Sequence, residues 1–459
     1  MLSAGSFQPL PQVAHAELLT FLLQLVLLLS VAMVLGRLAV RWSMPSVVGE
    51  LLAGVLLGPS VLGAAFPGAW DSLFPHSVEQ SHMLDAVAQL GVLLLVGFTG
   101  SQLDLQLVRR RGADALRVSL GGLCLPLGLG IAVGFFLPAE LMGTSDRATF
   151  AFFIGVALCV SAIPVIAKTL SDLGLMHRDV GQLTLTAGMV DDAVAWLLLS
   201  VVSAMATGAV HGWEVASAVG VLAAVIAGCA LVGRPLVRAL LRRADRSSTA
   251  GATSATAVAV ILGGAAATQF LGLEPVFGAF VAGVLLGKPL ADGVVSPVAL
   301  APLRTFVMSV GAPVFLATAG LRIDLSALAD PAVLLAGLGV LAVAVIGKFG
   351  GAYLGGRLSR IGHRESMALG AGLNARGVVE VVMALAGLRL GVLTTASYTI
   401  IVLIAVMTSL MAPPLLRWAM AGIEHTPAER IREQAHAMWV PGAVAPGTTA
   451  AERPHPPAS

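Results

Sequence analysis

The chain has 459 residues, of which 57 % are hydrophobic and 11 % are charged, and its formal net charge is +2. A soluble domain carries about a quarter charged residues, so this composition excludes a soluble globular protein and predicts one that crosses a membrane many times. Basic patches interleaved with aromatic residues are absent from the sequence, and nucleic acid is therefore not an expected partner. No cysteine or histidine cluster has zinc spacing, so we expect no cofactor and interpret the 3 cysteines as small buried apolar residues.

Apolar runs of roughly 20 residues predict membrane helices, and we identify about 13 of them, which predicts an all-α polytopic protein. Residues 1–14 precede the first run and are expected to lie outside the cell. The second and ninth runs are short, and the fifth and twelfth contain helix breakers. In chain order the predicted spans lie near 17–40, 46–63, 82–103, 116–137, 148–171, 179–206, 213–240, 252–272, 276–289, 301–321, 331–356, 365–389 and 396–421.

The basic residues predict how these spans are oriented. The first basic residue, Arg37, follows the first apolar run, so this run is expected to stay in the mature protein as a helix. With the N-terminus outside, most of the 27 lysines and arginines fall on the cytoplasmic side, and three fall outside, at Arg147, Arg322 and Arg389. This asymmetry predicts an N-out, C-in topology. Residues 423–459 are polar and rich in proline and alanine, and are expected to form a disordered cytoplasmic tail.

Two short motifs occur twice and indicate an internal repeat. AGVLLG is found at 53–58 and again at 282–287, and GSQLDL at 100–105 resembles GLRIDL at 320–325. The copies are seven spans apart, and because seven is odd they cross the membrane in opposite directions. The pattern predicts an inverted repeat of about five helices, which is typical of secondary transporters. The alternative is a coincidence of small-residue packing motifs.

Helix breakers interrupt both the fifth span and the twelfth, its partner in the repeat. Ser161 and Pro164 lie in the middle of the fifth, and Gly370, Asn374 and Gly377 weaken the twelfth. Broken helices free backbone carbonyls that can coordinate a cation or balance a charge. We therefore expect two crossed broken helices near the bilayer midplane, with Pro164 and Asn374 supporting the breaks. For Pro164 alone, a plain kink is the alternative.

Two adjacent aspartates, Asp191 and Asp192, lie mid-way along the sixth span, where each carboxylate is costly. Neighbouring residues on a helix point about 100° apart, so the two cannot share one partner equally. We expect one to pair with Lys348 of the eleventh span and the other to face a water-filled cavity. A static ion pair that holds helices together is the alternative, but it leaves the second aspartate unpaired.

The remaining charges within spans have weaker interpretations. Arg376 and Glu380 are spaced i,i+4 and are expected to neutralise each other beside the break in the twelfth span. Glu50, near the inner end of the second span, either reaches the interface or lines a cytoplasmic funnel. The Ser161 hydroxyl, or backbone oxygens at the breaks, could complete an oxygen shell around an alkali cation.

The chain resembles the monovalent cation/proton antiporter-2 family over about 40–420. The resemblance rests on stretches such as PSVVGELLAGVLLGPSVLG, TAGMVDDAVAWLLL, FGAFVAGVLLGKPL and NARGVVEVVMALAG. It implies a homodimer in which a core domain moves against a dimerisation scaffold, an elevator mechanism, all within a transmembrane domain at 15–422. By position, the scaffold would be about 15–104 and 252–325, the linker helix about 213–246, and the core about 116–206 and 331–422.

The same resemblance implies roles for the paired aspartates. It assigns Asp192 as the carboxylate that binds the transported metal cation and the proton, and Asp191 as the partner of Lys348. The double aspartate is similar to that of electrogenic sodium/proton members and favours Na+, whereas NARG resembles plant-type exchangers, some of which move K+. The expected function is exchange of Na+ or K+ for H+ across the lipid bilayer of the cell membrane, without enzyme activity.

Two alternatives come from other classes of protein. One is a sodium-coupled symporter of an organic anion on a similar inverted-repeat fold. The other is an intramembrane aspartyl protease, but its G-x-G-D motif is absent and its two aspartates lie on different helices.

Overall fold

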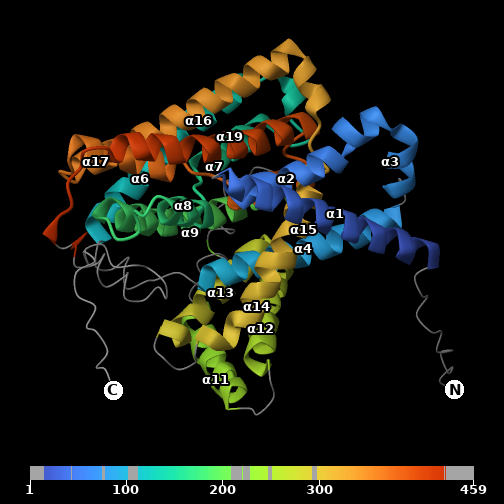
Figure 1. Cartoon of the computed structure of the whole chain (residues 1–459), viewed down its shortest axis with the longest axis horizontal. Helices are drawn as coiled ribbons and strands as arrows, with labels where there is room; N and C mark the ends of the chain where they lie inside the picture. Colours follow the sequence, from blue (N-terminus) through green and yellow to red (C-terminus); the bar gives the residue numbers. More distant parts are fainter. Residues whose placement is uncertain are drawn as a thin grey trace, which may run out of the picture.

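The computed structural model describes residues 15–42, 44–74, 78–101, 112–207, 220, 228–246, 251–291, 297–427 and 429–430. These residues are almost entirely helical, and Met142 and Leu393 form an isolated β-bridge. The helices labelled in Figure 1 are α1 (His15–Arg41), α2 (Ser46–Leu57), α3 (Pro67–Leu73), α4 (Val78–Ser101), α6 (Gly112–Phe136), α7 (Arg147–Cys159), α8 (Ile163–Asp172), α9 (Asp179–Thr207), α11 (Arg234–Asp245), α12 (Ala252–Phe270), α13 (Pro275–Ala291), α14 (Ala301–Phe306), α15 (Ala312–Gly320), α16 (Pro331–Leu358), α17 (His363–Leu373) and α19 (Thr395–Met420); α18 (Val378–Arg389) follows α17.

Within the described residues, 9 helical stretches are long and apolar enough to cross a membrane, or 10 when α17 and α18 count as one bent span. The predicted fifth span is divided between α7 and α8, and the predicted ninth is the shorter α13. The predicted seventh span, near 213–240, falls largely outside the described residues. The all-helical membrane architecture is therefore observed, while the count of 13 stays a prediction.

The helices form two sets that pack mainly within themselves. We call α6–α9 and α16–α19 the core helices, and α1, α2, α4, α12, α13 and α15 the scaffold helices. Among the core helices, α6 packs along α16 and α7, and α17 lies between α16 and α19. Among the scaffold helices, α4 packs along α13 and α2 along α15. Contacts between the sets are sparser and include α9 with α13 and α18 with α15.

Glycines allow the scaffold helices to cross at close range, and the two crossings resemble each other. A Cβ added to Gly54 of α2 would lie 2.6 Å from the Gly320 Cα atom of α15. A Cβ added to Gly283 of α13 would lie 3.1 Å from the Gly100 Cα atom of α4 and 2.0 Å from the Gly97 carbonyl oxygen. A side chain at Gly54 or Gly283 would therefore clash with the backbone of the facing helix, so glycine is required at each crossing. The four glycines belong to the two repeated motifs of the sequence.

Both predicted breaks are present, and the two breaks contact each other. The chain is extended between α7 and α8, where the Ala162 N–H donates to the Ala375 carbonyl at 3.1 Å. Ser161 Oγ donates to the Leu373 carbonyl at 2.9 Å. Pro164 is the second residue of α8, a position where a missing N–H leaves no ladder bond broken. It therefore stands at the start of a new helix and does not kink a continuous one.

Candidate functional site

The C-terminal end of α7 presents three backbone carbonyls that have no partner within the helix. Arg376 donates to the carbonyls of Ala157 at 3.1 Å and Leu158 at 2.6 Å. Lys348 Nζ donates to the carbonyl of Cys159 at 2.5 Å. Two cations thus meet the negative end of one helix, where positive charge is favourable.

Asp191 is held by three side chains, two from helices and one from the break between α7 and α8. Lys348 Nζ of α16 lies 2.6 Å from its Oδ2 atom, and Ser161 Oγ lies 2.9 Å from the same atom. Ser119 Oγ of α6 donates to the other oxygen at 2.7 Å. Asp191 and Lys348 are both 0 % exposed. Every oxygen of this carboxylate therefore has a partner, as a buried charge requires.

Asp192 is equally buried, at 1 % exposed, but it is not satisfied. The backbone N–H of Ile163, the first residue of α8, donates to this carboxylate. The Oδ1 atom has no hydrogen-bond partner among the described residues. A buried carboxylate oxygen without a partner is costly. A proton or a small cation would supply the missing partner.

A small cavity of about 10 Å³ adjoins Asp192 at the boundary between core and scaffold helices. This volume holds about one water molecule at most. Its walls come from α4 and α13 of the scaffold and from α9 and α18 of the core. The residues that line the cavity are Leu95, Val96, Thr99, Asp192, Trp196, Phe280, Val378 and Val379.

Arg376 and Glu380 form the second buried ion pair, with Arg376 NH1 3.1 Å from Glu380 Oε1. Arg376 also donates to the Ala344 carbonyl at 3.3 Å, and Ser409 Oγ donates to the carbonyl of Arg376 itself. The predicted i,i+4 contact is therefore formed directly beside the break. Asn374 is fully buried in the break, and neither polar atom of its side chain has a partner among the described residues.

Glu50 lies apart from this cluster. It is 8 % exposed on α2 and lines a cavity of about 380 Å³ with Arg37, Ser46 and Ser309, among others. The structure brings Asp191, Asp192, Ser161 and Lys348 together but does not add Glu50 to them. Sequence reasoning missed Ser119, although a serine within an apolar span was a usable signal. It also missed Thr99 and Phe280, which the order of spans does not bring to Asp192.

Part of the expected disordered tail, 423–427 and 429–430, is described by the structure and packs against the start of α9, whereas the rest of that tail lies outside the described residues. Arg178 Nε lies 3.3 Å from Glu429 Oε1, and that oxygen also accepts the Asp179 N–H at 2.7 Å. The rings of His177 and His425 stack with centroids 5.6 Å apart. Burial raises the pKa of Glu429, but the N–H groups of Asp179 and Thr426 and the Arg178 guanidinium outweigh it and hold this pKa below its ordinary value of 4.5.

Residues 25–422 match the family described as sodium/hydrogen exchanger, transmembrane. The Na+/H+ antiporter NhaS4 of Synechocystis sp. is 31 % identical over 404 residues, which are 87 % of this chain and 97 % of that protein. The Na+/H+-K+ antiporter GerN of Bacillus cereus is 29 % identical over 87 % of this chain and 96 % of its own length. Cation/H+ antiporter 15 of Arabidopsis thaliana is 31 % identical over 86 % of this chain, which spans 47 % of that protein.

The fold is also similar to that of a solved structure. The sodium proton antiporter MjNhaP1 of Methanocaldococcus jannaschii superposes with a TM-score of 0.63 over 88 % of this chain and 98 % of that one, at 16 % sequence identity. At this identity the similarity shows a common fold.

Proposed function

The chain belongs to the sodium/hydrogen exchanger family, and from that premise we propose that Asp192 is the site at which it exchanges a monovalent cation for protons. The observation that carries this proposal is the unpartnered oxygen of a fully buried carboxylate, beside an aspartate whose oxygens are all engaged. Because the Asp192 site accepts one positive charge, a proton and an alkali cation compete for it. We favour Na+ over K+ because of the double aspartate.

Competition at one carboxylate yields obligatory exchange when the empty site cannot cross the membrane. A bare carboxylate is costly in an apolar environment, so only the site that holds a proton or a cation moves between the two sides. Asp192 lies where α9 and α18 face α4 and α13. This position supports alternating access in which the core helices move against the scaffold helices.

The crossings of the scaffold helices support the inverted repeat. Gly54 against Gly320 and Gly283 against Gly100 pair the two motifs in the same way in each half. Arg322, which is predicted to lie outside, pairs at 2.5 Å with Asp85, near the start of the predicted third span. These contacts are in line with the N-out, C-in topology that we propose. We further propose a homodimer, as the family resemblance implies.

Lys348 decides the electrical character of the exchange. If Lys348 also releases its proton when the cation binds, two protons are exchanged for each cation and transport carries net charge. Lys348 pairs with Asp191 and not with Asp192. This pairing supports a scheme in which Asp192 binds the cation while Lys348 releases a second proton. The relatives named above are antiporters, which favours exchange over the symport of an organic anion.

Ion flux in proteoliposomes tests the proposal. With an imposed pH gradient, Na+, K+ and Li+ are each added to vesicles that contain the purified protein, with and without a clamped voltage. We expect cation-dependent proton movement that Asp192→Asn abolishes. Glu424→Gln, a change outside the spans, is the matched control and should exchange normally. Retained exchange in Asp192→Asn would exclude Asp192 from this role, and solute uptake without proton counterflow would favour the symporter.

A further inference from the structure

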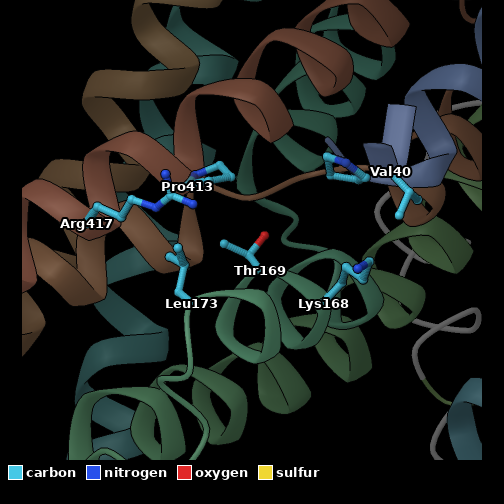
Figure 2. Close-up of a pocket in the computed structure, with 7 residues that line it drawn as sticks. Val40, Lys168, Thr169, Leu173, Pro413 and Arg417 are labelled. Carbon is cyan, nitrogen blue, oxygen red and sulfur yellow. The ribbon is translucent and has the colours of Figure 1, made fainter. Parts of the chain in front are cut away.

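A cavity of about 220 Å³ lies between the corner that joins α1 to α2 and the core helices α8 and α19 (Figure 2). Its volume is several times the ~30 Å³ that one water molecule takes up in the liquid, so it can hold a group of several heavy atoms. One wall comes from scaffold helices and the other from core helices. The residues that line it are Val40, Pro45, Lys168, Thr169, Leu173, Pro413 and Arg417.

The charge of this cavity favours an anion. Lys168 and Arg417 both line it, and none of the described residues on its wall is acidic. A cavity with positive walls repels cations and attracts anions. It is therefore poorly suited as a passage for the transported cation. Arginine and lysine side chains both bind phosphate oxygens.

Thr169 supplies a hydrogen-bond donor that has no acceptor in the described chain. The residue is 4 % exposed, and its Oγ1 atom makes no hydrogen bond there. Figure 2 shows this atom pointing into the space that Arg417 and Lys168 flank. Other helical threonines donate to the carbonyl four residues earlier, as Thr184 and Thr408 do. An oxygen-bearing ligand in the cavity would satisfy the Thr169 hydroxyl.

Two tryptophans place the cavity at the level of lipid headgroups. Trp42, two residues after Val40, is 63 % exposed, and Trp418, next to Arg417, is 62 % exposed. Exposed tryptophans are typical of the boundary between membrane and water. The cavity thus opens near the depth at which phosphates of phospholipids lie.

We propose that this cavity binds a phosphate group, that of an anionic phospholipid headgroup, through Arg417, Lys168 and the Thr169 hydroxyl. If the protein exchanges cations for protons as proposed above, a bound headgroup also affects transport. Because the walls belong to both sets of helices, a bound headgroup holds core and scaffold together and slows exchange. Free phosphate from solution has the same chemistry, and the experiment separates these two sources.

Thermal unfolding of the purified protein in a nonionic detergent tests binding without any transport. The probes are dioctanoyl phosphatidylglycerol, dioctanoyl phosphatidylcholine and inorganic phosphate. We expect the unfolding temperature to rise with phosphatidylglycerol and not with phosphatidylcholine. The rise should disappear in Arg417→Gln and Thr169→Val, and persist in Thr169→Ser. It should also persist in Arg41→Gln, which removes a charge from an exposed residue of α1 that does not line the cavity.

Each outcome of this experiment decides the matter. A rise with inorganic phosphate alone supports the site and assigns it to a soluble anion. No rise with phosphatidylglycerol or inorganic phosphate, an equal rise with phosphatidylcholine, or an equal rise in Arg417→Gln and the unsubstituted protein overturns the proposal.

Transport in vesicles tests the consequence. Vesicles of phosphatidylcholine with increasing fractions of phosphatidylglycerol should exchange several-fold more slowly with the unsubstituted protein and Arg41→Gln, but not with Arg417→Gln. Exchange that slows equally in all three would show a general effect of surface charge and overturn the inference while the proposed function stands. Absence of exchange in pure phosphatidylcholine would instead contradict the proposed function, and the unfolding experiment would still report binding.

Discussion

Lys348 and Arg376 are two buried cations at the same helix end, and they differ in what surrounds them. Both donate to carbonyls at the end of α7, and both pair with a carboxylate. Arg376 pairs with Glu380 on its own segment, four residues away. Lys348 reaches from α16 to Asp191 on α9, next to a second carboxylate.

The difference lies in the charge that each region leaves over. Arg376 and Glu380 neutralise each other, so this region carries no net charge, although Glu380 Oε2 makes no hydrogen bond among the described residues. Lys348, Asp191 and Asp192 together carry one excess negative charge when all are ionised. One proton or one monovalent cation restores neutrality there. The Arg376–Glu380 region therefore secures the broken helices, whereas the region of Lys348, Asp191 and Asp192 can accept a proton or a monovalent cation.

The largest effect on exchange is expected from a substitution of Asp192. Asp192→Asn removes the excess charge, so exchange in proteoliposomes should fall to the level of empty vesicles, with the unfolding temperature unchanged or raised. Glu380→Gln is the matched control, since it also neutralises a buried carboxylate, and it should retain exchange. If the two variants lost exchange equally, the distinction between the regions would be wrong.

Lys348→Gln should be the most destabilising single change. It leaves Asp191 buried without its cation, which costs about 3–5 kcal/mol, measured as the free energy of unfolding. Adding Asp191→Asn should recover much of this loss, because the unpaired charge is then gone. Voltage dependence of exchange should also decrease in Lys348→Gln. Unchanged electrogenicity would contradict the two-proton scheme.

Glu380→Gln should lower the free energy of unfolding by less, about 1–3 kcal/mol. Arg376 keeps its bonds to the Ala157, Leu158 and Ala344 carbonyls, which still satisfy much of the guanidinium. The pH dependence of exchange should stay as in the unsubstituted protein. A shifted pH profile would show that this pair takes part in proton binding.

Ser161→Ala and Ser119→Ala test how much the two hydroxyl groups that donate to Asp191 contribute to the second region. Each removes one hydrogen bond from a hydroxyl group to the ionised Asp191 carboxylate, worth about 1.5–3 kcal/mol. We expect a small drop in unfolding temperature and a change of a few-fold in the cation concentration for half-maximal exchange. A complete loss of exchange in Ser161→Ala would instead indicate that its hydroxyl contacts the transported ion.

The smallest effect is expected at the ion pair outside the spans. The pKa of Glu429 is lowered on folding, so its contribution to stability is present above 4.5 and is lost as pH falls through the folded value. In Glu429→Gln, the Asp179 amide should exchange with deuterium faster than in the unsubstituted protein at neutral pH. This difference should vanish in acid. An equal rate in both proteins at neutral pH would show that the contact is unimportant.

Much of the central region was predictable because charges in apolar runs stand out. The breaks at Ser161 and Asn374, the contact of Arg376 with Glu380 and the pairing of one of the two aspartates with Lys348 were expected from spacing and cost. The choice of Asp191 as that aspartate came from the family resemblance. The unsatisfied oxygen of Asp192 was not, since it depends on the direction of one side chain. Which carbonyls accept hydrogen bonds from Arg376 and Lys348 also depends on how α7 ends in three dimensions.

The packed beginning of the tail could not be predicted for a different reason. Arg178 and Glu429 are about 250 residues apart and lie in ordinary polar sequence. Their contact exists because α9 begins near the point where α19 ends, which only the tertiary structure reveals. The same applies to Glu50, whose place on α2 was clear while the cavity that it faces was not.

Proton release on cation binding tests most directly whether Asp192 holds a proton and a cation in turn. The purified protein is placed in weakly buffered detergent solution, NaCl or choline chloride is added, and the released protons are followed with a pH indicator dye. We predict release with NaCl in the unsubstituted protein and in Glu380→Gln, and none with choline chloride or in Asp192→Asn. Release of the same size in Asp192→Asn would contradict the account.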